Sequence, residues 1–386
     1  MTYGDYQNQI HLRGLQGVVP RFPVAAADLE AAAAAAMAPS VWTYVAGGAG
    51  DERTQRANVT AFERRGIVPR MLVGASNRDL SVDLFGMHLP SPLFLAPVGV
   101  LGVAAQDGHG DLATARASAR TGVPMVASTL SEDPLEAVRE AQGDTPGMFQ
   151  LYTPTDRDLA ASLVRRAEDA GYAAVVVTLD TWVTGWRPRD LQTANFPQLR
   201  GAALANYLSD PAFLAGVPVP TDPRSVIEHW TRVFGNPLRW EDLAWLRGLT
   251  DLPLVLKGIC AADDARRAVD AGVDGVYVSN HGGRQANGVP AIDLLPEVVA
   301  AVGDDAPVLF DSGVRSGTDV VTALALGATA VGLGRPYVHG LALGGTDGVE
   351  HVVRSVLAEA DLLMAVNGFP DLAALRTADV RSIPAW

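Results

Sequence analysis

The chain has very little cysteine and no long run of hydrophobic residues. Its 386 residues contain one cysteine, Cys260, so an internal disulfide and a cysteine-rich zinc site are both excluded. No stretch approaches the roughly 18–20 consecutive apolar residues that a membrane-spanning helix requires. The opening residues, MTYGDYQNQIHLRG, lack the apolar core of a secretory signal. We therefore expect a soluble, cytoplasmic protein with no membrane partner.

Clusters of basic residues are also missing. The formal net charge is −13, and lysine and arginine are nowhere grouped. Because an acidic surface repels phosphate backbones, nucleic acid is not an expected partner. An anionic small molecule would need individually placed arginines instead. Histidine, cysteine, aspartate and glutamate nowhere show the spacing of a metal site, so no metal is predicted.

Eight short apolar runs alternate with amphipathic stretches along the chain. Strands that are apolar throughout are buried on both faces, which is typical of a parallel sheet. Eight strand–helix units in series predict a (β/α)₈ TIM barrel. A doubly wound open sheet is the alternative, but it usually has fewer units and a glycine-rich first turn, which is not found here. The runs lie at 92–97, 124–128, 148–152, 173–180, 253–258, 275–280, 307–313 and 328–334, and helical patterns between them include 110–122, 156–171, 262–272 and 318–327.

The rest of the chain fits one domain, residues 1–386. Residues 1–90 precede the first unit and are predicted to form an N-terminal helical cap, with an alanine-rich helix at 25–37. The barrel would then occupy 91–386. A long loop at 188–240 interrupts the rhythm after the fourth strand, and loops of this length are usually functional. An active-site lid and a passive insertion are both open for this loop.

Active sites of TIM barrels form at the C-terminal ends of the strands. All eight runs end in polar residues or glycine, which is more than folding requires and therefore indicates a site. The residues at these ends are Pro97, Val98, Gly99, Ser128, Gln150, Tyr152, Thr178, Asp180, Lys257, Ser279, His281, Arg284, Asp311, Gly313, Arg315, Gly334 and Arg335.

Two of these ends, after the fourth and the sixth run, carry recognisable chemistry. In SNHGGRQ (279–285) two glycines let the chain turn close to a ligand, with His281 before them and Arg284 after them. Asp180 is suited to orient and charge-stabilise an imidazole. Arg187 and Arg284 together could hold one carboxylate, although a surface ion pair is the alternative for Arg187.

The last two strands end in DSGVRSG (311–317) and GLGRP (332–336), glycine-rich turns that each contain an arginine. Barrels bind phosphate at this place, so a phosphorylated ligand is predicted without its identity. Lys257 has three open roles: it could form a Schiff base, contact a phosphate, or stabilise negative charge on a cofactor.

A resemblance to a known family covers almost the whole chain. It rests on TYVAGGAGDE (43–52), LAPVGV (95–100), FQLY (149–152), TLDTWVTGWRPRDL (178–191), LKGI (256–259), SNHGGRQANG (279–288), LFDSGVRSG (309–317) and GLGRPY (332–337). The chain resembles the FMN-dependent 2-hydroxy-acid oxidases and dehydrogenases. GWRPRDL makes it most similar to the lactate 2-monooxygenase branch of that family.

The resemblance implies a role for each strand end. His281 would be the base, Asp180 would support the resulting imidazolium, and Lys257 would stabilise the reduced flavin. Substrate binding is implied for Tyr44, Tyr152, Arg187, His281 and Arg284, with Tyr152 also counted among the catalytic residues. FMN binding is implied for Pro97, Val98, Gly99, Ser128, Gln150, Thr178, Lys257, Ser279, Asp311, Ser312, Gly313, Val314, Arg315, Gly334 and Arg335.

The implied reaction transfers a hydride equivalent from a small L-2-hydroxy acid, with L-lactate first, to flavin N5, and O₂ reoxidises the flavin. A retained keto acid would be decarboxylated to acetate, whereas a released one would leave as pyruvate with H₂O₂. Gly99 stands where many oxidases have alanine, and a modest aliphatic residue at Leu130 suits a small substrate. Homologues of this family form tetramers or octamers, so a homo-oligomer is implied. The alternatives are an oxidase, a quinone-linked dehydrogenase, an FMN-binding barrel of isomerase type and a non-catalytic binding protein.

Overall fold

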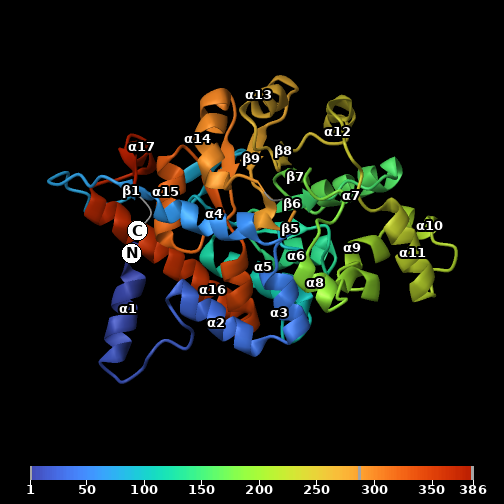
Figure 1. The fold of residues 1–386 in the computed structure, drawn as a ribbon, viewed down its shortest axis with the longest axis horizontal. Coiled ribbons are helices and arrows are strands. Elements are labelled where there is room, and N and C mark those ends of the chain that lie inside the picture. The colour runs from blue at the N-terminus through green and yellow to red at the C-terminus, as the bar shows by residue number, and fades with distance from the viewer. Residues whose placement is uncertain (1, 286–287, 384–386) are drawn as a thin grey trace.

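The computed structural model describes residues 2–285 and 288–383, so the ends of the predicted domain and two residues of the SNHGGRQANG motif, Ala286 and Asn287, lie outside it. A barrel of eight parallel strands with helices around it forms the centre of the molecule (Figure 1), which confirms the predicted fold. Hydrogen-bonded neighbours follow the order β4-β11-β10-β9-β8-β7-β6-β5, and a bridge between Leu95 and Met125 joins the two ends of this order. The strands are β4 (Leu93–Leu95), β5 (Val126–Ser128), β6 (Met148–Leu151), β7 (Val175–Thr178), β8 (Leu254–Lys257), β9 (Gly275–Val278), β10 (Val308–Phe310) and β11 (Ala330–Leu333).

Every residue of these eight strands is buried, as their mostly apolar composition predicts. The polar residues within them, Ser128, Gln150, Thr178 and Lys257, are hydrogen-bonded to other side chains. A small hairpin, β2 (Val82–Leu84) and β3 (Met87–Leu89), packs against the barrel interior. Its Leu84 and Leu89 join Phe94 and Tyr277 in one buried cluster. The hairpin therefore fills the interior from the side opposite the strand ends discussed below, and the barrel is a packed core there rather than a pore.

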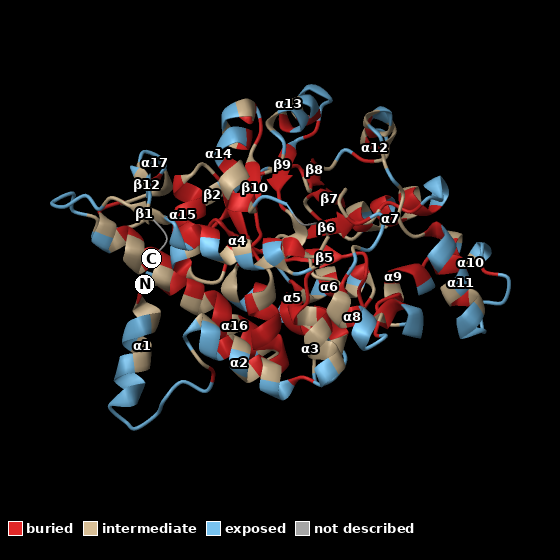
Figure 2. Ribbon diagram, in the orientation of Figure 1, coloured by how far each residue is buried: buried red, intermediate tan, exposed pale blue. Residues whose placement is uncertain are grey.

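The surrounding helices each bury one face (Figure 2). In α7 (Arg157–Asp169) the buried residues recur at three-to-four spacing, and the side chain of Asp156 caps the first turn by accepting hydrogen bonds from two backbone N–H groups. The other covering helices are α5 (Gly110–Thr121), α6 (Leu135–Ala141), α12 (Leu243–Arg247), α13 (Ala262–Asp270), α14 (Ala291–Val302), α15 (Gly317–Ala325) and α16 (Arg335–Asn367). Across the described part of the chain, none of the helices combines the length and apolarity needed to cross a membrane.

The N-terminal cap is helical only in its first part. It contains α1 (Asp5–Gly14), α2 (Ala26–Ala36), α3 (Pro39–Ala46) and α4 (Arg53–Glu63). The prediction of a helical cap is wrong for residues 64–90, which contain strands. Strand β1 (Arg65–Ile67) pairs antiparallel with β12 (Val380–Ser382), and β2 and β3 form the hairpin. The short helix α17 (Leu372–Leu375) precedes β12. These strands are three residues long, too short for an alternation of apolar and polar residues to be recognised.

Residues 188–240 are a series of short helices rather than the predicted loop: α8 (Pro188–Gln192), η2 (Pro197–Arg200), α9 (Ala205–Leu208), α10 (Pro211–Ala215), α11 (Pro223–Val233) and η3 (Trp240–Asp242). Prolines stand in the first turns of four of these helices, where a missing N–H costs nothing. Side chains anchor the middle of the segment. Asn206 bonds to the backbone of Ser128, Thr129 and Leu135, and the buried carboxylate of Asp210 pairs with Arg166 at 3.1 Å.

Candidate active site

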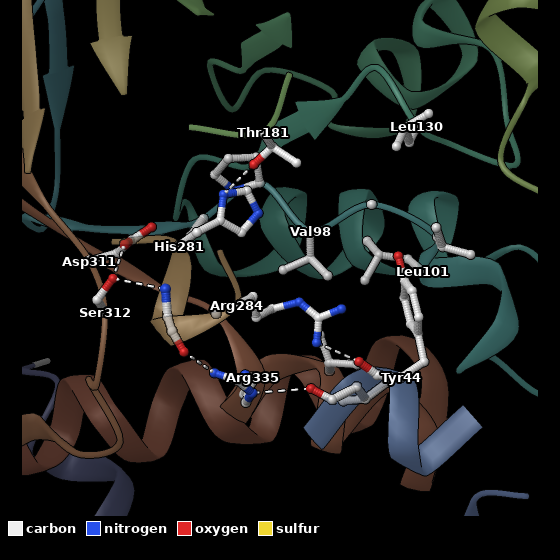
Figure 3. A pocket seen from close by; sticks show the side chains of 18 of the residues that line it. Tyr44, Val98, Leu101, Leu130, Thr181, His281, Arg284, Asp311, Ser312 and Arg335 are labelled. Atoms are coloured by element: carbon white, nitrogen blue, oxygen red, sulfur yellow. Dashed lines mark hydrogen bonds between the residues drawn. The ribbon is translucent and has the colours of Figure 1, made fainter. Parts of the chain in front are cut away.

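The C-terminal strand ends surround one cavity, which the close view in Figure 3 shows. The helical cap and the 188–240 segment add residues from outside the barrel, so the cavity is covered on the side away from the strands. Of the predicted site residues, the lining contains Tyr44, Pro97, Val98, Gly99, Tyr152, Arg187, Lys257, His281, Arg284, Asp311, Ser312, Gly313, Val314, Arg315, Gly334 and Arg335.

The remaining five predicted residues do not line the cavity: three of them bond to one another, and two bond to lining residues. Gln150 accepts a bond from the Ser128 hydroxyl at 3.1 Å and donates one to the Thr178 hydroxyl at 3.0 Å, so three neighbouring strands are tied together. Ser279 bonds to Lys257, and Asp180 bonds to His281. The sequence placed these five residues at the right strand ends, but it could not separate lining residues from their supports.

His281 sits on a strained turn that two amide side chains hold in place. Its φ is +57°, a left-handed value that non-glycine residues rarely adopt, and Gly282 and Gly283 continue the turn at positive φ. Asn280 accepts a hydrogen bond from the N–H of Gly283 and exchanges two amide bonds of 2.7 and 2.8 Å with Asn58 of α4. Glycine is needed at position 283 because a Cβ there would lie 2.5 Å from a backbone nitrogen of α4.

His281 and Asp180 form a close pair, with 2.9 Å between Nδ1 and Oδ1. Burial would raise the pKa of Asp180, but the charges of His281 and Lys257 and hydrogen bonds from His281 and Thr181 outweigh burial and lower the pKa to about 2. An ionised carboxylate only accepts hydrogen bonds, so Nδ1 carries the hydrogen and Nε2 is left as the basic nitrogen. Burial lowers the pKa of His281, helped by the charges of Lys257 and Arg187 and opposed by Asp180, so the neutral imidazole is favoured.

Two arginines bring positive charge to the same cavity. Arg284 lies with its guanidinium 5.0 Å from the ring centre of Tyr44 and donates to backbone oxygens of residues 44 and 47. Arg187 donates to the carbonyl of Arg284 and to the side chain of Gln285, and it is not the surface ion pair that the sequence left open. Burial and the neighbouring charge of Arg284 lower the pKa of Arg187 to about 10, which still leaves it protonated at neutral pH. Two cations held this close attract an anion between them.

Tyr152 provides a further hydroxyl in the lining of the cavity. Burial, with the charge of Asp180 as the next cause, raises its pKa, so the phenol keeps its proton and can donate a hydrogen bond. Tyr44 lies close to Gln198, whose amide donates to the Tyr44 hydroxyl at 3.3 Å.

Lys257 is the only lysine in the sequence and is almost fully buried. Its Nζ lies 3.0 Å from the Ser279 hydroxyl and 3.9 Å from a carboxylate oxygen of Asp311. That carboxylate also accepts hydrogen bonds from Tyr277, Ser279 and Ser312, so it is satisfied within the protein. Among the described residues, the Asp311 carboxylate at 3.9 Å is the only one within ion-pair distance of the buried ammonium, which is therefore suited to stabilise further negative charge on a group bound above it.

The far end of the cavity fits a phosphate. Arg315 and Arg335 line it, and burial lowers the pKa of both, with the charge of Arg315 adding to the effect on Arg335. Neither has a carboxylate partner within ion-pair distance in the described part of the chain. Gly334 begins helix α16, and a Cβ there would meet nothing within 4 Å, so the backbone is open to the cavity. Two buried cations at an uncovered helix N-terminus therefore fit an elongated ligand with an anionic phosphate at this end.

Several lining residues were missed by the sequence. The segment 188–240 supplies Phe196, Gln198, Trp230 and Phe234. Thr181, the residue after Asp180 in the sequence, also lines the cavity. Gln198, Trp230 and Phe234 stand far from any strand end, so strand-end reasoning had no way to find them. In residues 2–285 and 288–383, histidine, cysteine, aspartate and glutamate nowhere form a group of three or more that could hold a metal ion.

Comparisons with known proteins agree with this geometry. The family model described as FMN-dependent dehydrogenase matches residues 33–382. An L-lactate oxidase of Lysinibacillus sphaericus is 43% identical over 92% of both chains, and a 4-hydroxymandelate oxidase of Amycolatopsis orientalis is 42% identical over 92% of this chain and 97% of its own. A crystal structure of mandelate oxidase superposes with a TM-score of 0.84 at 40% identity, covering 94% of this chain and all of that one.

A barrel with this cavity defines a flavin-binding oxidoreductase, and the chain belongs to the FMN-dependent dehydrogenase family, as the resemblance predicted. The phosphorylated ligand is FMN, and the protein is an FMN-dependent oxidoreductase that acts on 2-hydroxy acids.

Proposed function

We propose that the protein oxidises L-lactate with O₂ and releases acetate, CO₂ and water, which is the lactate 2-monooxygenase reaction. The observation that carries this proposal is the cavity itself, in which two arginines, two tyrosines and a neutral histidine paired with a carboxylate face one small space. Such a set matches a substrate with one carboxylate and one hydroxyl group on adjacent carbons. The relatives named L-lactate oxidase support the small substrate.

The chain's own residues divide the work. Arg187 and Arg284 grip the substrate carboxylate, and the hydroxyls of Tyr44 and Tyr152 contact the bound acid and its product. His281 takes the proton of the reacting centre at Nε2, and Asp180 stabilises the imidazolium that results. FMN, when bound, would supply the acceptor for the hydride equivalent of the substrate α-carbon and the route of those electrons to O₂.

FMN is held along the strand ends. The backbone of 97–99 with Ser128, Gln150, Thr178 and Ser279 positions the ring, and Lys257 stabilises its negative charge when reduced. Arg315 and Arg335 contact the phosphate, together with backbone groups of 312–314 and Gly334. Asp311 belongs to the cofactor site but not to the phosphate contact, because its carboxylate would repel a phosphate.

The fate of the keto acid decides between two outcomes. If pyruvate stays bound until peroxide forms beside it, peroxide attacks it and acetate and CO₂ are released; if it leaves first, pyruvate and H₂O₂ are the products. We infer that 188–240 retains the product, since its Phe196, Trp230 and Phe234 line the cavity. The bonds of Asn206 and Asp210 oppose movement of the whole segment, so local movement of these aromatic residues is the proposed gate.

Product analysis after aerobic turnover of L-lactate, with catalase absent, tests the proposal. Acetate and CO₂ with little free peroxide would support it. Pyruvate with one equivalent of H₂O₂ would make the protein an oxidase. Turnover of (S)-mandelate but not of lactate would instead assign the aromatic residues of the cavity to an aromatic substrate. A shortened 188–240 segment that leaves the product ratio unchanged would refute the gate.

Gly99→Ala is expected to shift the products from acetate toward pyruvate and peroxide. A Cβ at this position would lie 3.1 Å from the Cβ of Leu130, so the added methyl narrows the space in which product and O₂ meet. We expect the peroxide yield per lactate to rise at least about twofold, while the protein loses on the order of 1 kcal/mol of stability from overpacking. Peroxide and acetate measured from the same reaction check this. Gly86→Ala, a distant glycine in the hairpin, controls for the loss of stability.

The rate of flavin reduction by lactate is expected to depend on pH through His281. The neutral imidazole is the base, and its pKa lies below the ordinary value of 6.5 because of burial. The rate should therefore be constant from about pH 7 upward and should fall about tenfold per pH unit only on the acid side of the pKa. Anaerobic stopped-flow measurements from pH 5 to 9 check this. A rate that rises steadily between pH 7 and 9 would show that another group limits the reaction.

The cytoplasmic location and a tetrameric or octameric assembly remain predictions. Size-exclusion chromatography with light scattering tests the assembly.

A further inference from the structure

The hydroxyl of Thr181 lies against both members of the histidine–carboxylate pair. Its Oγ is 3.1 Å from Oδ1 of Asp180 and 3.0 Å from Nδ1 of His281. Thr181 is 7% exposed, and Figure 3 shows it directly beside the imidazole ring. Thr181 and Tyr152 line the same cavity. One hydroxyl at the cavity wall therefore contacts both the Asp180 carboxylate and the His281 imidazole.

The bonds to Asp180 show why this hydroxyl matters. Oδ1 of Asp180 accepts from Nδ1 of His281 and from the hydroxyl of Thr181, whereas Oδ2 is buried without a partner in the part of the chain that the structure describes. A buried carboxylate normally needs several donors. Here Thr181 supplies one of the two hydrogen-bond donors to the Asp180 carboxylate, and its oxygen also faces the Nδ1–H of the His281 imidazole.

We propose that Thr181 is a positioning residue, whose hydroxyl holds the Asp180 carboxylate and the His281 ring together so that Nε2 points steadily toward the substrate. This inference rests on the proposed function, in which His281 is the base. The inference uses the three distances among the side chains of Thr181, Asp180 and His281, and the lack of a hydrogen-bond partner for Oδ2 of Asp180 among the described residues. Serine would preserve the hydroxyl, and valine would preserve the shape without it.

Loss of the hydroxyl leaves Asp180 with His281 as its single hydrogen-bond donor. The Asp180 carboxylate then depends more on the His281 ring to stabilise its charge, and a protonated ring does so better than a neutral one. Protonated His281 is therefore favoured, and the pKa of His281 rises. The other charged groups that face His281 are Lys257 and Arg187, and both act in the opposite direction in either protein. Lys257 and Arg187 are unchanged by the substitution, so a rise in the pKa of His281 is assigned to loss of the Thr181 hydroxyl.

The test compares Thr181→Val with Thr181→Ser and with Thr184→Val. Thr184 lines the same cavity, but its hydroxyl contacts neither Asp180 nor His281. Flavin reduction by L-lactate is followed anaerobically from pH 5 to 9. For Thr181→Val we expect the acid limb to move up by about 0.5–1 pH unit, and the limiting rate to fall about tenfold with the apparent substrate affinity within about twofold. Serine should restore both, and Thr184→Val should leave the acid limb in place.

A second measurement does not require turnover. Histidines are labelled with ¹⁵N, and the ring signals of the seven histidines are titrated, with His281→Gln assigning the signal of interest. The same upward shift is expected in Thr181→Val. An unmoved titration, a serine variant no better than valine, or an effect on substrate affinity alone would overturn the proposal. If no 2-hydroxy acid is oxidised but the titration shifts, the proposed function fails while the role of Thr181 in the pair stands.

Discussion

His281→Gln is expected to slow flavin reduction by L-lactate on the order of 10³- to 10⁴-fold, because it removes the base from a pair built to accept a proton. Glutamine fills similar space and can still donate toward Asp180, so the turn and the bound FMN should persist. Anaerobic stopped-flow at saturating lactate measures the effect directly. FMN content and the visible spectrum should match those of the unaltered protein.

A matched control for this variant exists on the surface. His88 pairs with Asp83 at 2.8 Å, the same Nδ1-to-carboxylate arrangement, but both side chains are exposed and neither lines the cavity. His88→Gln should leave the rate unchanged within experimental error. If His281→Gln kept more than a tenth of the original rate, a group other than His281 would be the base.

Arg187→Leu is expected to lower kcat/KM for L-lactate on the order of 10²- to 10³-fold. A buried guanidinium paired with a substrate carboxylate contributes strongly, since its removal leaves the anion in a site with one cation fewer. The discriminating substrate is the neutral amide of lactate. Its kcat/KM should change much less, so the preference for acid over amide should collapse in the variant.

Arg189→Leu is the control in the same segment. Arg189 lies two residues away and forms a half-exposed ion pair with Glu52 at 2.6 Å, and surface pairs contribute about 0–1 kcal/mol. The control should keep kcat/KM within about twofold. Arg187 also bonds to Gln285 and to the backbone of Arg284, so thermal unfolding and FMN content must be measured for both variants. An equal loss for acid and amide in Arg187→Leu would mean that the residue supports the structure rather than the carboxylate.

The strands could be predicted because burial on both faces demands mostly apolar residues, with the few polar ones near the C-terminal ends. Each of the eight runs contains the strand that the structure has, and the helix at 156–171 contains α7. The three-residue strands in the cap and the helices of three to five residues in 188–240 are too short to carry a period. Helix α11 is the exception, because its eleven residues carry buried positions at three-to-four spacing, and the sequence analysis missed that period. In that segment the prolines indicate a turn and the first turn of a helix equally well.

The sequence alone determined which side chains stand at the C-terminal ends of the strands, because a residue's place along a strand is a local property. His281, Lys257 and Arg315 were found in this way. Only the tertiary structure decided which of them meet. Asp180 and His281 are 101 residues apart in the chain, and their 2.9 Å contact depends on barrel closure and on the left-handed turn at His281. The hydroxyl of Thr181, the aromatic cover from Trp230 and the lowered pKa of His281 likewise arise from distances between separate elements. Hydrogen bonding and desolvation act over a few ångströms in space, and no local pattern of residues encodes those distances.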